Sequence, residues 1–179
     1  GFGIQHIFND IVSGFVILFE GTIKVGDIIE LQGEVSKVRQ IDIRTTKVEN
    51  RNGNFIIIPN SEITSNHLKN WSYTEVVSRH DIPIGVAYGS DTKVVKETLL
   101  QVAENNPHVK KDMPIQVVFT NFGDSALDFE LRIWMNRTWE MDLVISDLRY
   151  AIDQSFREAN ISIPFPQRDV HIKGNASNP

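Results

Sequence analysis

Few side chains in this sequence have the types and spacing that catalysis or metal binding needs. His80 and Asp81 are adjacent, and Asp169 and His171 are two residues apart. Neither spacing by itself forms a catalytic triad or a set of metal ligands, which must converge from several directions. We interpret both pairs as ordinary surface residues.

The remaining candidates for chemistry have structural explanations. Asp124 and Ser125 follow Gly123, and a turn accounts for both, since no histidine is placed to activate the serine. The stretch 1–3 (Gly-Phe-Gly) lacks the preceding strand and the lysine of a phosphate loop. The chain has no cysteine, which excludes disulfides and thiolate metal sites. The sequence therefore predicts no enzyme, no cofactor and no metal site.

The composition indicates a folded protein that does not bind nucleic acid. The chain has 179 residues, of which 41% are hydrophobic and 23% charged, and its net charge is −5. Phosphate contact usually needs a basic face, and here the local basic cluster has no aromatic stacking platform. That cluster comprises Lys37, Arg39, Arg44, Lys47 and Arg51. We interpret it as solvated strand faces, with anionic lipid head groups as another possible contact.

Residues 1–20 form the most apolar stretch, and their pattern predicts an amphipathic helix. The apolar stripe at helical spacing is Ile4, Ile7, Phe8, Ile11, Phe15, Leu18 and Phe19. The other side carries Gln5, His6, Asn9, Asp10 and Ser13. The uncharged run 11–19 is shorter than the roughly 20 apolar residues of a spanning helix, so we expect no crossing by this helix alone. Two interpretations stay open: a core helix of a soluble domain, or a helix at a membrane or in an assembly.

Residues 21–73 predict a small Sm- or SH3-like β-barrel. Several short apolar strands are separated by turn signals at 25–27 and at Asn52-Gly53. Imperfect alternation in 34–48 predicts a bulge near Gln40. After the strand 55–58, either Asn60 or Ser61 is expected to cap a short helical turn.

Residues 74–166 predict a ferredoxin-like α+β domain with the order β-α-β-β-α-β. The first strand is expected at 80–88, followed by a helix capped by Ser90 or Asp91. Strands at 114–122 and 127–136 come next, then a helix from about 141 to 160, and a closing strand at 161–165. The apolar stripe of the helix predicted from about 141 to 160 consists of Met141, Val144, Leu148, Ile152 and Phe156.

The end of the chain predicts a strand without a partner at 167–173 and a disordered tail at 174–179. An isolated strand is unstable, so it needs a partner, which could be its copy in another subunit. The chain also opens with Gly1 inside an apolar helix. We therefore expect it to be the later part of a longer protein.

Several stretches, in this order and spacing, resemble the small-conductance mechanosensitive channel (MscS) family over residues 1–173. They are 1–20 with Gln5 and Val12-Ser13-Gly14, then 23–27 (IKVGD), 56–60 (IIIPN), 70–72 (NWS), 85–91 (GVAYGSD) and 164–167 (PFPQ). The resemblance implies a mixed α/β architecture: the end of a pore helix (1–20), the β-barrel (21–73), the α+β domain (74–166) and a C-terminal strand (167–173). It also implies a homoheptamer whose soluble parts form a cytoplasmic vestibule, with the last strands joined at its base.

The resemblance also implies three pore or gating residues. Phe2 falls near a ring of apolar side chains that narrows the pore and can gate it by dewetting. His6 stands where the family has a kink glycine, which puts the usual hinge in doubt. Gly14 matches a family glycine and is our preferred hinge, although close packing of the helix on the barrel would explain it equally well.

The function implied by the resemblance is the cytoplasmic part of a tension-gated channel subunit in the inner (plasma) membrane, which releases ions and small solutes on hypo-osmotic stress. Its partners would be its own copies and membrane lipids. The alternative from another class is a soluble regulatory or RNA-binding module that combines a small barrel with a ferredoxin-like domain.

Overall fold

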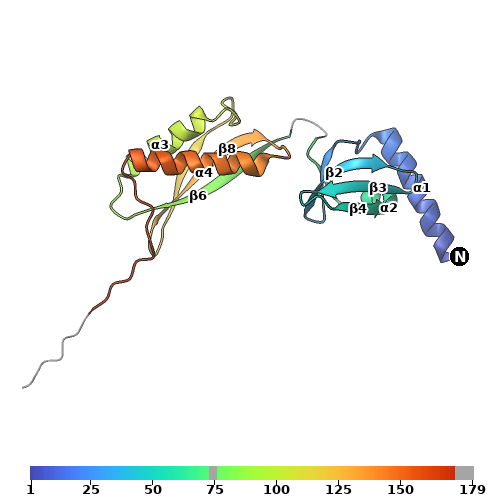
Figure 1. Ribbon diagram of the computed structural model, residues 1–179, viewed down its shortest axis with the longest axis horizontal. Helices are drawn as coiled ribbons and strands as arrows, with labels where there is room; N and C mark the ends of the chain where they lie inside the picture. The colour runs from blue at the N-terminus through green and yellow to red at the C-terminus, as the bar shows by residue number, and fades with distance from the viewer. Residues whose placement is uncertain (73–75, 172–179) are drawn as a thin grey trace, which may run out of the picture. The chain divides into compact units, whose positions relative to one another are not determined.

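The computed structural model describes residues 1–72 and 76–171, which form two compact units (Figure 1). The first unit comprises Gly1–Ser78 with Asn136–Met141, and the second comprises Arg79–Met135 with the chain from Asp142 onward. The mixed α/β class with an N-terminal helix is confirmed. The expected boundary at 73/74 and the expected tail at 174–179 lie outside the described residues.

The first unit opens with helix α1 (Phe2–Glu20). The helix ends where Gly21 adopts a left-handed conformation, with φ 64°, and its N–H donates to the carbonyl oxygen of Ile17 at 2.9 Å. Glycine takes this conformation without the steric cost that a Cβ would bring, so it stops the helix at this point.

A five-stranded antiparallel sheet in the order β4-β3-β2-β1-β5 forms the barrel predicted for this unit. Its elements are β1 (Ile28–Leu31), β2 (Glu34–Ile41), β3 (Thr45–Asn50), β4 (Phe55–Pro59), α2 (Asn60–Ser65) and β5 (Leu68–Asn70). The pairing of β2 with β3 shifts register between Val38 and Gln40, which confirms the bulge predicted near Gln40. The core of this unit comprises Ile17, Ile23, Ile29, Leu31, Val38, Val48, Ile58 and Ile63.

The motifs at 23–27 and 70–72 meet at one end of this sheet. The Asp27 carboxylate accepts hydrogen bonds from the backbone N–H of Lys24 at 2.9 Å and from Asn70 Nδ2 at 2.8 Å. Ser72 Oγ accepts from the N–H of Ile28 at 3.0 Å. These residues therefore fix the start of β1 against the end of β5.

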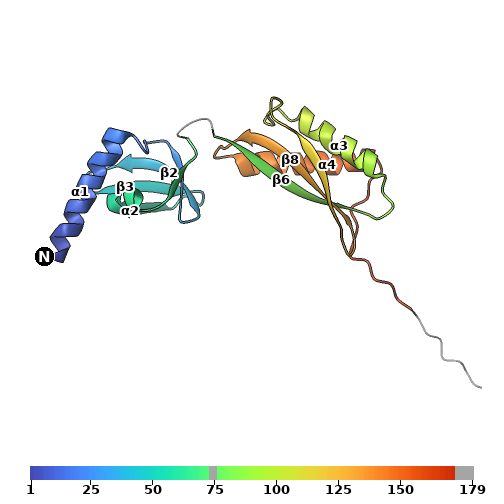
Figure 2. The ribbon, with the colours of Figure 1, turned by 180° about the vertical axis from the view of Figure 1, so that it is seen from behind.

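The second unit is a three-stranded sheet in the order β6-β8-β7, with both of its helices on one face (Figures 1 and 2). Its elements are β6 (Val77–Val86), α3 (Thr92–Asn105), β7 (Gln116–Phe122), β8 (Leu127–Asn136) and α4 (Met141–Glu158). Every second residue of β8 is buried, as its alternation predicted. Asp91 caps α3, because its carboxylate accepts from the N–H of Lys93 at 2.9 Å.

The closing strand predicted at 161–165 is wrong, because the structure forms no strand there. One ladder-like bond remains beside β6, from the N–H of Ala87 to the carbonyl oxygen of Ser162, at 2.8 Å. Pro164 and Pro166 have no N–H to donate, so pairing cannot continue past the first residues.

The C-terminal strand predicted at 167–173 is not formed where it is described, from 167 to 171, and its last two residues lie outside the described chain. Among the described residues no strand pairs with this segment, and an isolated strand is not stable.

Candidate functional site: the first helix and its seat on the barrel

Helix α1 contacts the barrel through residues that lie beside its apolar stripe, and not through the stripe itself. Its buried residues are Asp10, Gly14 and Ile17. The stripe lies exposed, with Phe15 57% and Phe19 87% accessible to solvent, apart from the half-buried Ile11. Within this chain the interpretation of a core helix with a buried stripe is therefore wrong. The stripe is uncovered, as the second interpretation required.

Gly14 lies at the point where α1 comes nearest to the barrel. A Cβ added there would lie 2.3 Å from the carbonyl oxygen of Ile43 and 2.7 Å from Asn60 Nδ2. No real Cβ tolerates such distances, so only glycine allows the helix to come this close. This geometry supports the packing explanation for Gly14, while a hinge at this position stays a prediction.

Polar contacts flank Gly14 on the same side of the helix. Asp10 is 8% exposed. Its carboxylate accepts hydrogen bonds from both the backbone N–H and the hydroxyl of Ser61. Ser13 Oγ lies 2.9 Å from Thr64 Oγ1. A carboxylate paired in this way is oriented as well as bound, because charge-assisted bonds are short and directional. The helix is therefore held in one rotational setting.

Asn60 organises the surface on which α1 lies. Its side chain is fully buried, accepts from Thr46 Oγ1 at 2.8 Å, and donates to the carbonyl oxygens of Asp42 and Ile43 at 3.0 and 3.1 Å. The prediction that Asn60 or Ser61 caps a helical turn is wrong, because α2 starts after Pro59 without a side-chain cap. The asparagine instead holds the β2–β3 connection against α2.

We call this surface the seat and define it as Ile43, Asn60, Ser61 and Thr64. Sequence reasoning missed it, although the IIIPN motif contained its central residue. A polar residue directly after a buried strand was the available signal, but a cap explained it equally well at that stage.

Phe2 and His6 lie at the free end of α1, which extends past the barrel (Figure 1). Both are exposed, and Phe2 is 83% accessible. Phe2, His6 and Asp10 follow one another at intervals of four, so His6 lies between Phe2 and the docked Asp10 along one side of the helix. Phe2 and His6 therefore lie near each other, whereas Gly14 lies in the seat. All three residues belong to the continuous helix α1.

Helix α1 is long enough to cross a membrane by length and composition alone. It has 19 residues with a mean hydropathy of 1.4, and in the described part of the chain it is the one helix that meets this condition. At 1.5 Å per residue it measures about 28 Å. The prediction that this helix is too short to cross a membrane is wrong. Asp10 interrupts the run of uncharged residues, but the helix continues through it.

The other candidate residues form no reactive group. Asp81 pairs with Arg79 at 2.9 Å, and Ser125 Oγ accepts from the N–H of Gln167 at 3.1 Å. In the basic cluster Arg39 pairs with Glu49, and Lys47 lies 3.6 Å from Asp42. Over residues 1–72 and 76–171 there is no group of three histidine or acidic residues that could hold a metal ion.

Comparison with known proteins places both units in one family. Residues 6–73 match the β-domain of mechanosensitive ion channels, and residues 80–163 match the C-terminal domain of the mechanosensitive ion channel MscS. The mechanosensitive channel MscK of Escherichia coli is 40% identical over 175 residues, which cover 96% of this chain and 15% of MscK. A small-conductance mechanosensitive channel of Helicobacter pylori is 29% identical over 98% of this chain and 64% of the relative.

Solved structures agree with these matches. The closed-state crystal structure of Helicobacter pylori MscS superimposes with a TM-score of 0.87 at 28% identity, over 97% of this chain and 68% of that one. Arabidopsis thaliana MSL1 shares the fold, with a TM-score of 0.71 at 16% identity. The chain spans 15–16% of the length of two of its curated relatives, MscK and an MscS family protein of Haemophilus influenzae. The family is one of channels and not a class of enzymes. From these matches, the chain belongs to the MscS family of mechanosensitive ion channels, of which it carries the β-domain and the C-terminal domain.

Proposed function

We propose that this chain is the cytoplasmic part of a tension-gated channel subunit of the inner membrane, which releases ions and small solutes on hypo-osmotic stress. The observation that carries the proposal is the orientation of α1. A helix that docks by Asp10 and Gly14 and leaves its apolar stripe uncovered is built for contact with lipid or with other copies of itself. No catalytic role is proposed.

The proposed assembly is a homoheptamer in which the soluble units enclose a vestibule. Apolar side chains left exposed in the single chain support assembly, because soluble monomers rarely expose many together. Besides the stripe, they include Phe165, which is 84% accessible, and Val170, which is 79% accessible and lies in the segment 167–173 predicted to pair with its copies. In the same proposal the pore helix ends at residue 20, where the β-barrel begins at residue 21, and the C-terminal strand begins at residue 167, after the α+β domain.

Phe2 is proposed to form the apolar constriction of the pore, with His6 one turn further along α1. A ring of such side chains closes a pore by dewetting, and tension opens it by favouring a wider arrangement of the helices. Gly14 is the proposed hinge. Because it touches Ile43 and Asn60, a movement of α1 at this residue would act directly on the barrel.

Patch-clamp recording of the full-length protein in membranes without other mechanosensitive channels tests the proposal. We expect currents that appear with suction, and a lower opening tension for Phe2→Ser, because a polar ring wets more easily. Leu143→Ser is the matched control, since Leu143 is 61% exposed on α4. Absence of tension-activated current in the wild-type protein would refute the channel function, and equal thresholds for the two variants would refute the role of Phe2.

Gly14→Ala tests the hinge in the same recordings. If the backbone bends at Gly14 during opening, this variant shifts the tension threshold, because alanine stiffens the helix and crowds the seat. An unchanged threshold in a channel that still opens would leave Gly14 with a packing role only.

A further inference from the structure

The free end of α1 carries one ionisable side chain, His6. The helix holds three ionisable residues, His6, Asp10 and Glu20. Asp10 is buried and bound to Ser61, and Glu20 is the last residue of the helix, at the other end from Phe2. Of the three, only His6 is exposed within about one turn of the proposed constriction.

Helical geometry places His6 on the side of α1 that carries Phe2. Four residues span about 1.1 turns, or about 6 Å along the axis, so the two side chains lie one above the other. Residues 1–9 are all exposed, and over the described residues no other element packs against this end of the helix. Because Phe2 is proposed to narrow the pore, His6 lines the same pore one turn further along.

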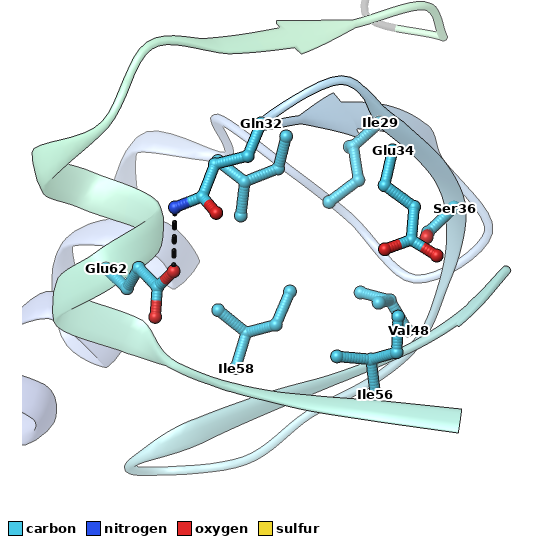
Figure 3. A pocket seen from close by; sticks show the side chains of 9 residues that line it. Ile29, Gln32, Glu34, Ser36, Val48, Ile56, Ile58 and Glu62 are labelled. Carbon is cyan, nitrogen blue, oxygen red and sulfur yellow. Dashed lines mark hydrogen bonds between the residues drawn. The ribbon is translucent and has the colours of Figure 1, made fainter. Parts of the chain in front are cut away.

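Helix α2, which packs against α1 at the seat, directs no free charge towards His6. The one ionisable residue of α2 is Glu62, and its side chain points into an open pocket of the barrel (Figure 3). There Glu62 Oε1 accepts a hydrogen bond from Gln32 Nε2 at 3.1 Å. The carboxylate of α2 is therefore oriented away from the free end of α1.

The β2–β3 connection touches α1 at Gly14 and carries two charged side chains, Asp42 and Arg44. Asp42 is paired with a lysine of β3 at 3.6 Å, and Arg44 is exposed. Gly14 lies eight residues from His6, which is about 12 Å along the helix, and exposed charges this far apart are largely screened. On α1 itself, the Asp10 carboxylate lies one turn from His6 and is already hydrogen-bonded in the seat.

We propose that His6 determines the ion preference of the pore and makes its opening depend on pH. This inference rests on the proposed channel function and deepens it. In an assembly of identical subunits the His6 side chains form a ring around the pore. Imidazole is the side chain whose charge changes between about pH 5 and about pH 8. When protonated, the ring is cationic and favours anions, as rings of lysine or arginine do, and when neutral it loses this preference.

Protonation of the ring also favours the open state. Like charges repel one another, and their repulsion falls as the ring widens. The open arrangement therefore binds protons more readily than the closed one, so protonation shifts the population towards it. A charged side chain beside the Phe2 ring also opposes dewetting. Both effects lower the opening tension as the pH falls.

Patch-clamp recording of the full-length protein in a KCl gradient tests the inference at about pH 8 and about pH 5. The reversal potential of the open channel gives the permeability of chloride relative to potassium. We expect this ratio to rise about fivefold at the lower pH, because charges near each other in water interact by more than the thermal energy. We also expect the opening tension to fall.

Three variants identify the charge that responds. His6→Gln should remove the pH dependence of both selectivity and opening tension, because an amide does not titrate. His6→Lys should keep the acid-pH selectivity at both pH values, because its ammonium group stays charged. His108→Gln is the matched control, since it removes an exposed histidine of the second unit, and it should respond as the wild-type channel does.

The outcomes separate this inference from the proposed function. Absence of tension-activated current in the wild-type protein would refute the channel function itself. A wild-type channel with equal selectivity at both pH values, or a pH response that persists in His6→Gln, would overturn the role of His6 and leave the channel function standing. If His6→Gln abolishes the response but His6→Lys shows no anion preference, His6 acts by its shape and not by its charge, which also overturns the inference.

Discussion

Helices α1 and α4 carry similar apolar patterns and use them in opposite ways. Helix α4 buries its stripe of Val144, Leu148, Ile152 and Phe156 in the second unit. Helix α1 leaves its stripe exposed and buries Asp10, Gly14 and Ile17. An apolar stripe thus shows that a helix face must be covered, but it does not show whether the chain itself covers it.

The difference lies in the residues that each helix carries outside its apolar stripe. The opposite face of α4 is charged, with an ion pair between Arg157 and Asp153 at 3.0 Å, so it remains in water. The docked side of α1 has Ile17, which is buried in the core of the first unit, and a glycine and two short polar side chains that match the seat. Helix α1 is therefore attached by one buried apolar side chain, Ile17, together with a close approach at Gly14 and specific hydrogen bonds, and not by its apolar stripe.

The largest expected effect is the difference in stability loss between a substitution in the buried stripe of α4 and one in the exposed stripe of α1. Phe156→Ala should lower the free energy of unfolding of the second unit by about 3–5 kcal/mol, because Phe156 is 1% exposed and its loss leaves a cavity. Phe19→Ala should change stability by less than about 0.5 kcal/mol in the dilute single chain, since Phe19 is 87% exposed. Urea unfolding measures both. Similar losses for the two variants would show that α1 buries its stripe after all.

The second effect concerns the close approach of α1. Gly14→Ala should destabilise the first unit by about 1–3 kcal/mol, because its Cβ would overlap the Ile43 carbonyl and Asn60. Gly3→Ala is the matched control: a Cβ there meets nothing within 4 Å, and alanine favours the helix by up to about 1 kcal/mol. Thermal unfolding compares them. If Gly14→Ala is as stable as Gly3→Ala, α1 is not held in the seat.

The third effect concerns the Asp10 carboxylate. Asp10→Ala should cost about 2 kcal/mol, because it leaves the Ser61 donors without their charged acceptor. A double-mutant cycle with Ser61→Ala isolates the side-chain bond, and we expect a coupling near 1 kcal/mol. Asn9→Ala, at an exposed neighbouring position, controls for the effect of alanine itself. If the stability losses of the two single variants simply add in the double variant, the two side chains do not interact in solution.

The smallest effect should come from Ser13. Ser13→Ala removes one hydroxyl pair with Thr64 that is open to solvent, so we expect a loss of about 0.5 kcal/mol or less. The same unfolding curves measure it. A loss as large as that of Asp10→Ala would indicate that the edge of the seat contributes as much as its buried centre.

Much of the fold follows from local patterns in the sequence. The alternation from Leu127 to Asn136 predicted β8, and a cap at Ser90 or Asp91 predicted the start of α3, where Asp91 is the cap. The strand predicted at 161–165 is wrong: its apolar pattern is typical of a strand, but only one ladder-like bond forms beside β6 and two prolines follow it closely. Local signals succeed where a residue acts on its own neighbours, and they fail where pairing depends on another part of the chain.

The candidate site was predicted only in part. The family resemblance identified Phe2, His6 and Gly14, and the structure shows that the first two lie free while the third lies against the barrel. The contacts of Asp10 with Ser61 join residues 51 positions apart. The spacing of residues within α1 cannot indicate a partner that lies so far away in the sequence.

The sequence by itself determined that residues 1–20 form a helix with one apolar and one polar side, since both follow from local spacing and propensity. Only the tertiary structure decided which side touches the barrel. The reason is physical: the direction in which a helix docks depends on the shape and the hydrogen-bonding groups of the surface that receives it. That surface is assembled from Ile43, Asn60 and Ser61, which come together only when the sheet has closed around its core.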